Sequence, residues 1–214
     1  MAEKKIFWSC DDGYYREETI EYNYFPGVAV SQKQRSISSL HTEIVKKYPK
    51  ARPLEISTKS TESTGVMLSA FNLEFFHEEL NEYRYVENVF LSSKVFERGG
   101  PYREVLDFHP KDAKRYEKIH SSGNLIAFDL YGIKWPIEPK TMFYDWIYIN
   151  ALMMHEGFIE ALAKWNVFTD IEFNHKKSVN CQARSAAIGL SLYKQNKLEE
   201  YISDIELFKT IYEV

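Results

Sequence analysis

The sequence predicts an α+β fold, rich in helix, that forms a single domain over residues 1–214. Several long stretches repeat apolar residues at the helical period, shorter stretches alternate apolar and polar residues as strands do, and no internal repeat or long linker divides the chain. Hydrophobic residues make up 44% of the sequence and charged residues 27%. This balance is typical of globular proteins rather than of disordered ones.

The first quarter of the chain is expected to contain one helix and one strand. Residues 1–30 are aromatic and polar, and Phe-Pro-Gly at 25–27 indicates a turn. A charged, amphipathic stretch predicts a helix over residues 34–48, which the following Pro49 ends. Residues 54–58 alternate like a short strand, and a Ser/Thr-rich loop follows.

The middle of the chain is expected to add two helices and a strand. Apolar residues from Val86 to Phe96 fall on roughly one side of a helix over residues 84–97. Gly-Gly-Pro at 99–101 ends that helix. Pro110 begins an amphipathic helix that ends near Gly123, and residues 125–130 form a strand.

The last third is expected to be mostly helical. Pro139 occupies the first position of a long aromatic helix that runs to about Met154. Residues 169–173 alternate as a strand, and residues 181–195 and 198–212 form two closing helices.

The charge of the chain is unevenly distributed. The formal net charge is −4, which argues against a general nucleic-acid coat protein. Residues 31–59, however, carry seven basic residues against two acidic ones, a local balance of +5. Such a stretch is able to bind a phosphate-bearing ligand locally, although a solvated helix face explains several of its lysines equally well.

Several functional classes are not supported by the sequence. No apolar run approaches the roughly 20 residues that span a bilayer, and the first residues lack a signal-peptide core, so we expect a cytoplasmic protein. The two cysteines, Cys10 and Cys181, have no disulfide or zinc spacing. His155 lacks a second histidine four positions later, and the common dinucleotide, nucleotide and serine-hydrolase motifs are absent. We therefore expect neither a metal nor a cofactor.

The first candidate site pairs a carboxylate with an amine. Glu87 and Lys94 are seven residues apart, about two helical turns, so on one helix both side chains would project from nearly the same face, with Leu91 between them. A carboxylate is able to stabilise oxocarbenium-like charge or activate water, and an amine is able to donate a proton, bind phosphate or attack a sugar aldehyde. The alternative is an exposed pair on a surface helix.

The second candidate site lies around the start of the helix at 181–195. Asp170 and Glu172 would point to the same face of a strand, and Ser178 or Asn180 would cap the helix. A helix N-terminus carries free N–H groups and a partial positive charge, which suit a diphosphate. The side chains proposed to serve this site are Asp170, Glu172, Asn180, Gln182 and Arg184. Ordinary capping with a surface arginine is the alternative.

The third candidate site is aromatic. Residues 143–148 place four aromatic side chains close together in one expected helix. Phe143 and Ile147 are better explained as core residues, whereas Tyr144 and Trp146 are candidates for stacking a base.

Three segments of the sequence resemble the motifs of a known family. LSAFNL (68–73), VENVFLSSKVFE (86–97) and NCQARSAAIGLSL (180–192) resemble the motifs of the NADAR, or YbiA-like, superfamily, and Glu87 and Lys94 fall on the Glu and Lys of its middle motif. The longer strings GGPY, EPKTMFYDWIYINAL and FTDIEFNHKKSVNCQARSAA are similar to the branch that accompanies DarT-type DNA ADP-ribosyltransferase toxins. The resemblance covers residues 25–195. It implies a YbiA/NADAR-like fold.

The resemblance also implies an activity. DarT-type toxins of this kind attach ADP-ribose to guanine in DNA, and the NADAR partner removes it as an antitoxin. The chain would then cleave the N-glycosidic bond of ADP-ribosylated DNA and release ADP-ribose, with a DarT-type toxin as its genetic partner. A YbiA-type N-glycosidase acting on riboflavin-pathway intermediates is one alternative, although Asn88 stands where that pattern has His. A module that only binds ADP-ribose or NAD is another.

The residue patterns and the resemblance together give expected roles for residues of this sequence. Glu87 is expected to be the catalytic carboxylate, Lys94 an amine close to the ribose C1″, and Asp170 a group that orients water or the second ribose together with Glu172. The groups expected to bind the diphosphate and ribose are Lys33, Arg35, Ser57, Lys59 and Arg184.

Overall fold

The computed structural model describes residues 1–174 and 180–213. Its N-terminal sheet has the strand order β2-β1-β9-β3. The strands are β1 (Ala2–Trp8), β2 (Arg16–Tyr22), β3 (Pro53–Glu55) and β9 (Val167–Thr169). β1 pairs antiparallel with β2 and β9, whereas β3 and β9 run parallel. The sequence did not predict β1 and β2, because charged residues interrupt the alternation in both. The strand expected at 54–58 is shorter, and the one expected at 169–173 begins and ends earlier.

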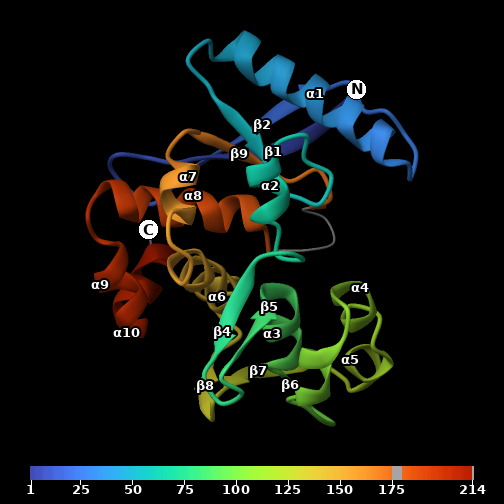
Figure 1. Ribbon diagram of the computed structural model, residues 1–214, viewed down its shortest axis with the longest axis vertical. Helices are drawn as coiled ribbons and strands as arrows, with labels where there is room; N and C mark the ends of the chain where they lie inside the picture. The colour runs from blue at the N-terminus through green and yellow to red at the C-terminus, as the bar shows by residue number, and fades with distance from the viewer. Residues whose placement is uncertain (175–179, 214) are drawn as a thin grey trace.

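Helix α1 (Val30–Lys47) covers one face of this sheet (Figure 1). Its buried residues Ile37, Leu40 and Ile44 pack with Ile6 and Ile20 of the first two strands. The prediction of a helix over 34–48 is confirmed, with a start four residues earlier. The helix ends where the Tyr48 amide donates to the Ile44 carbonyl.

The middle of the chain differs from the prediction of one helix over 84–97. A hairpin of β4 (Glu74–His77) and β5 (Glu82–Tyr85) leads into α3, which covers only Val86–Ser92. The hydroxyls of Ser92 and Ser93 both donate to the Val89 carbonyl, which competes with further helical hydrogen bonds. The chain then enters β6 (Lys94–Phe96), so Lys94 lies on a strand.

A second sheet of three strands follows α3. β6 pairs with β7 (Leu125–Leu130), which pairs with β8 (Ile133–Trp135). The expected strand at 125–130 is therefore confirmed. Between β6 and β7 the chain forms η1 (Arg103–Asp107), α4 (Pro110–Ala113) and α5 (Glu117–Ser121). The single helix expected from Pro110 to Gly123 is thus divided into two short ones.

The centre of the molecule is a helix pair, α6 (Met142–Met153) and α8 (Gln182–Lys194). A Cβ atom at Gly189 of α8 would lie 3.3 Å from Ile149 Cγ1 of α6, so glycine permits this close packing. Pro139 does not occupy the first position of α6. It follows a cis peptide bond, and Thr141 is the N-cap residue.

The remaining helices are short. α2 (Ser63–Met67) lies in the expected loop, and α7 (Phe158–Leu162) follows α6. The helix expected over 198–212 consists of α9 (Leu198–Ser203), α10 (Ile205–Lys209) and η2 (Thr210–Tyr212). Asp204 causes the break between α9 and α10, because its side chain accepts from the amides of Glu206 and Leu207 and so caps a new helix.

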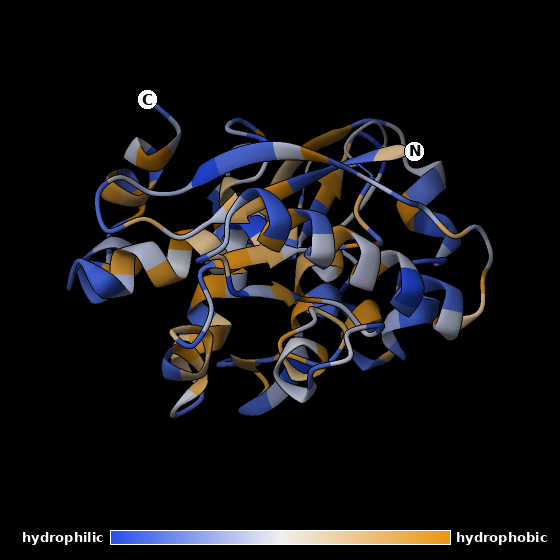
Figure 2. Cartoon of the chain, turned by 90° about the horizontal axis from the view of Figure 1, so that it is seen from above, coloured by the Kyte–Doolittle hydropathy of each residue, from blue (hydrophilic) through white to orange (hydrophobic). Residues whose placement is uncertain are grey.

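The structure combines α-helices with separate β-sheets, which confirms the predicted α+β class. More residues lie in helices than in strands. Hydrophobic residues lie mainly on the central strands and helices, while hydrophilic residues dominate the outer helix surfaces (Figure 2). Within residues 1–174 and 180–213, none of the helices combines the length and the apolar character needed to cross a membrane.

Candidate functional site

A cavity of about 480 Å³ lies where α3 and β6 face α4, α5 and the start of α8. Its volume falls within the ~300–1,000 Å³ of small-molecule sites. The predicted residues that line it are Glu87, Lys94, Tyr144, Asp170, Glu172, Asn180 and Gln182. The first and second candidate sites therefore share one cavity.

Glu87 and Lys94 reach this cavity from different elements. Glu87 lies in the first turn of α3 with only 8% of its surface exposed, and its amide donates to the Ala70 carbonyl at 3.0 Å. Lys94 is the first residue of β6 and places its ammonium 4.6 Å from the centre of the Phe90 ring. The prediction of one shared helix face is wrong, and so is the alternative of an exposed surface pair.

The surroundings of Lys94 favour its neutral form. Burial lowers the pKa of the Lys94 amine; Glu87 partly offsets this effect, and Lys114 adds to it. A lysine with a lowered pKa carries a larger fraction of free amine near neutral pH. The cavity thus presents a carboxylate beside an amine that is suited to proton transfer or nucleophilic attack.

Lys114 is a site residue that the sequence analysis missed. It lies at the C-terminal end of α4, with its ammonium 3.6 Å from Glu87 Oε1 and 5.4 Å from the centre of the Phe71 ring. Its neighbours are far away in sequence, so no local pattern indicates its position. Because its side chain is 62% exposed, this ammonium is accessible to a phosphate at the cavity entrance.

Asp170 also lines this cavity. One carboxylate oxygen, Oδ1, accepts from the amides of Glu172 at 3.0 Å and Phe173 at 3.1 Å. The other, Oδ2, accepts from Gln182 Nε2 at 3.1 Å. Gln182 in turn accepts from the Ala70 amide at 2.7 Å, so it connects Asp170 to the segment that holds Glu87.

Two buried groups of the cavity have raised pKa values. Burial raises the pKa of Asp170, the charge of Glu55 raises it further, and Lys4 opposes both. Burial also raises the pKa of Tyr144 well above its ordinary value, which keeps its hydroxyl neutral. Tyr144 lies edge-on to Phe90, with ring centres 5.1 Å apart. Phe143 and Ile147 are core residues, as predicted.

Arg184 does not line the cavity. Its guanidinium forms an ion pair with Asp145 at 2.7 Å, and this fully buried carboxylate also accepts from the hydroxyls of Ser185 and Tyr212. The predicted diphosphate clamp is therefore an internal ion pair that ties α8 to α6 and to the C-terminal turn.

We expect Arg184→Met to lower the free energy of unfolding by about 3 kcal/mol, because it leaves the buried Asp145 without its counter-charge. Chemical denaturation followed by circular dichroism measures this change. Arg115→Met is the control, since Arg115 is exposed and its loss should leave stability nearly unchanged. Unchanged stability of Arg184→Met together with lost ADP-ribose binding would restore the predicted ligand role.

Three other predicted residues have internal partners. Trp146 donates from Nε1 to the Ile202 carbonyl and packs against Trp135, so it is a core residue rather than a base-stacking one. Ser57 donates to Glu55 at 2.7 Å, and Lys59 Nζ donates to the neighbouring Thr58 hydroxyl at 3.0 Å. None of the three lines the cavity.

Lys33 and Arg35 lie on α1, and neither lines the cavity that contains Glu87. Lys33 forms an ion pair with Glu172 at 3.2 Å and lines a second cavity on the other side of that residue. The Arg35 guanidinium lies over the Phe25 ring, 4.2 Å from its centre.

The start of α8 differs from the predicted cap. Cys181 is the N-cap residue and makes no side-chain capping bond, so Asn180 does not cap the helix. The alternative cap, Ser178, lies outside the described residues. In the part of the chain that the structure describes, no three His, Cys, Asp or Glu side chains gather in a way that could hold a metal ion.

Fold and site together define a helix-rich α+β protein in which a buried carboxylate and a half-buried lysine face one cavity of small-molecule size. A comparison with protein families gives a match of residues 2–214 to the family of DarT1-associated NADAR antitoxins. Because the match spans nearly the whole chain, the protein belongs to this family, as its motifs predicted. A comparison with curated proteins found no match.

Proposed function

We propose that this protein removes ADP-ribose from guanine in DNA by hydrolysing the N-glycosidic bond, and that it thereby reverses the modification made by a DarT1 toxin. The observation that carries this proposal is the meeting of Glu87 and Lys94 in one cavity, although they come from a helix and a strand. Membership in the family of DarT1-associated antitoxins supports a DarT1 toxin as the partner of this protein.

Each of the three cavity residues Glu87, Lys94 and Asp170 has its own role in this proposed reaction. Glu87 stabilises positive charge that develops at C1″ when the bond to the base breaks. Lys94 lies beside it with a lowered pKa and either protonates the leaving base or attacks C1″ itself. Asp170, which lines the same cavity, orients the water that completes hydrolysis. None of these roles requires a metal or cofactor.

The cavity walls offer further contacts to ADP-ribose. Lys114 at the entrance is the cation placed to bind the diphosphate, in place of Arg184. Glu172 and Asn180 line the same cavity as Asp170 and are suited to bind ribose hydroxyls. A modified guanine would be met in a single strand or extruded from a duplex, at small cost because the ADP-ribose group weakens its pairing.

An oligonucleotide that carries ADP-ribose on guanine tests this proposal. We expect the protein to restore the unmodified strand mass and to release free ADP-ribose, and a chelator should not stop the reaction. Mass spectrometry of both products identifies the broken bond. An abasic strand would instead indicate a base-excising glycosylase, and release of AMP would indicate cleavage of the diphosphate.

Two other outcomes would overturn the proposal. An unchanged oligonucleotide together with cleavage of riboflavin-pathway intermediates would indicate a YbiA-type N-glycosidase. Stoichiometric binding of ADP-ribose without any product would indicate a binding module.

A further inference from the structure

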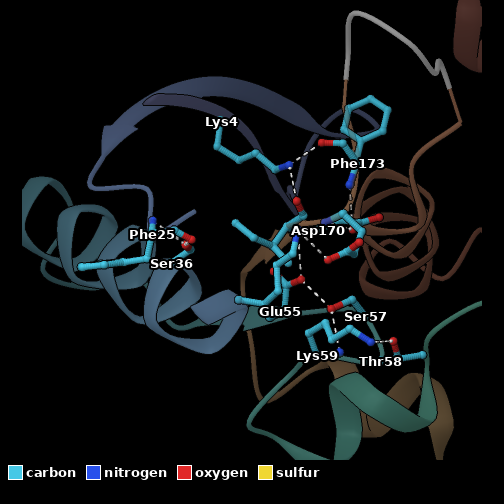
Figure 3. A network of polar contacts seen from close by, with 12 residues as sticks. Lys4, Phe25, Ser36, Glu55, Ser57, Thr58, Lys59, Asp170 and Phe173 are labelled. Atoms are coloured by element: carbon cyan, nitrogen blue, oxygen red, sulfur yellow. Dashed lines mark hydrogen bonds and ion pairs between the residues drawn. The ribbon is translucent and has the colours of Figure 1, made fainter. Parts of the chain in front are cut away.

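Three ionisable side chains are buried together at one wall of the cavity. Lys4 on β1, Glu55 at the end of β3 and Asp170 after β9 have exposed fractions of only 7%, 1% and 6%. Figure 3 shows Lys4 and Glu55 approaching the turn at 170–173 from different sides. Because buried charges are costly unless they are paired and hydrogen-bonded, such a cluster calls for a structural or functional reason.

Lys4 and Glu55 hold the backbone of this turn. The Lys4 ammonium donates to the Ile171 carbonyl at 3.0 Å and also to the Phe173 carbonyl. Glu55 accepts from the Ile171 amide at 2.7 Å, and the hydroxyls of Ser57 and Thr169 complete its hydrogen bonds. The backbone N–H and C=O of Ile171 are thus both bonded to a buried charged group.

The turn separates two cavities. Asp170, Glu172 and Phe173 line the cavity that contains Glu87. Ile171, Glu172 and Phe173 line the second cavity, of about 690 Å³, together with Lys4. Lys4 therefore reaches the wall from behind and does not line the cavity of Glu87.

We propose that Lys4 and Glu55 are positioning residues for Asp170, which fix the turn at 170–173 and control whether the Asp170 carboxyl is ionised where it faces the substrate. This inference rests on the proposed function for its link to turnover. It adds two residues that touch neither substrate nor reacting atoms and act on the site through Asp170.

The charges around Asp170 act in opposite directions. Burial and the negative charge of Glu55 raise the pKa of Asp170, whereas the positive charge of Lys4 lowers it. Tyr144 and Tyr148 on α6 and Cys181 before α8 also interact electrostatically with Asp170. Burial raises the pKa of each of these three groups, so each is neutral near pH 7. Among the neighbouring charges, Glu55 and Lys4 therefore have the largest effects on the pKa of Asp170.

The direction in which each substitution shifts the pKa of Asp170 follows from these charges. Lys4→Met removes a cation and should raise the pKa of Asp170, so the acidic limb of the pH–rate profile should move to higher pH by about one unit. Burial raises the pKa of Glu55 as well. Glu55→Gln removes the carboxyl that raises the Asp170 pKa and keeps the side-chain shape, so the same limb should move to lower pH. Lys5→Met is the matched control, because Lys5 precedes Ile6 on the same strand but pairs with Glu17 on β2. Its profile should not move.

A direct measurement separates this inference from the proposed function. The protein labelled with ¹³C at aspartate carboxyls is titrated by NMR without substrate, and the Asp170 signal is assigned by its loss in Asp170→Asn. We expect the Asp170 midpoint to rise in Lys4→Met and to fall in Glu55→Gln. This readout does not depend on the substrate, so it holds even where the oligonucleotide is not turned over.

Movement of the two midpoints in opposite directions would support the inference, and Lys4→Arg should return the midpoint toward the wild-type value. A purely structural role would lower the melting temperature of both variants and leave the midpoint where it was, which would overturn the inference. Equal shifts in the same direction would also overturn it. If Lys4→Met does not fold, the shift of the Asp170 midpoint in Glu55→Gln tests the inference alone: a fall supports it, and an unchanged or higher midpoint overturns it.

Discussion

Glu87→Gln is expected to lower the turnover of ADP-ribosylated oligonucleotide by at least about 100-fold while leaving the melting temperature close to that of the wild type. The carboxylate is 8% exposed and faces the cavity together with Lys94. Glutamine preserves the shape and the backbone bond to Ala70 but removes the negative charge. The variant should therefore still bind ADP-ribose while it loses the stabilisation of charge at C1″.

Single-turnover kinetics with the labelled oligonucleotide measure the rate, and circular dichroism measures the fold. Glu117→Gln is the matched control, since Glu117 is an exposed carboxylate on neighbouring α5. Its rate should equal that of the wild type. A Glu87→Gln rate above about a tenth of the wild-type rate, equivalent to roughly 1.4 kcal/mol of barrier, would show that Glu87 is not the catalytic carboxylate.

The sequence predicted the pairing of Glu87 and Lys94, but the physical reason it offered was wrong. The seven-residue interval suggested two turns of one helix, whereas the helix ends at Ser92 and Lys94 pairs with Phe128 in a sheet. Helical periodicity describes only local spacing. The strand at 94–96 forms because a partner strand some thirty residues later supplies its hydrogen bonds, and no local pattern contains that information.

Other parts of the site were hidden for a related reason. Lys4 lies in a segment that shows little alternation, and its burial arises when β1 is placed between β2 and β9. Lys114 approaches Glu87 only because α4 packs on α3. In contrast, Asp170 and Gln182 flank one helix start and were found from the sequence, since their interaction spans only 12 residues.

For Arg184, the sequence predicted a ligand-binding role, whereas the structure shows an internal ion pair. An arginine in the first turn of a helix resembles a phosphate-binding residue whether it faces a ligand or a buried carboxylate. The structure distinguishes the two, because Asp145 on α6 has no exposed surface and accepts from three donors that include Arg184. Composition and spacing do not identify such a partner 39 residues away.

Lys94 is expected to form a covalent bond with the sugar during turnover. Its lowered pKa favours the free amine, and Glu87 lies in the same cavity to stabilise the charge that develops as the base departs. The amine would bond to C1″ as the bond to guanine breaks, and the amine proton would move to the base nitrogen. Opening of the sugar ring gives an imine, and water then cleaves the imine to release ADP-ribose and the free amine.

Borohydride added during turnover should reduce that imine to a stable secondary amine and leave one ADP-ribosyl group on Lys94, which peptide mass spectrometry locates. Lys94→Arg keeps the positive charge but lacks the nucleophilic amine, so it should lose both the adduct and at least about 100-fold in rate. Lys114→Arg is the matched control, because Lys114 faces the same carboxylate from the cavity entrance, and this variant should leave trapping on Lys94 intact.

If Lys94→Arg retains activity, or if turnover proceeds without any trapped adduct, Lys94 acts through its charge. Direct attack by water on C1″ would then be the mechanism, with Glu87 opposite the departing base.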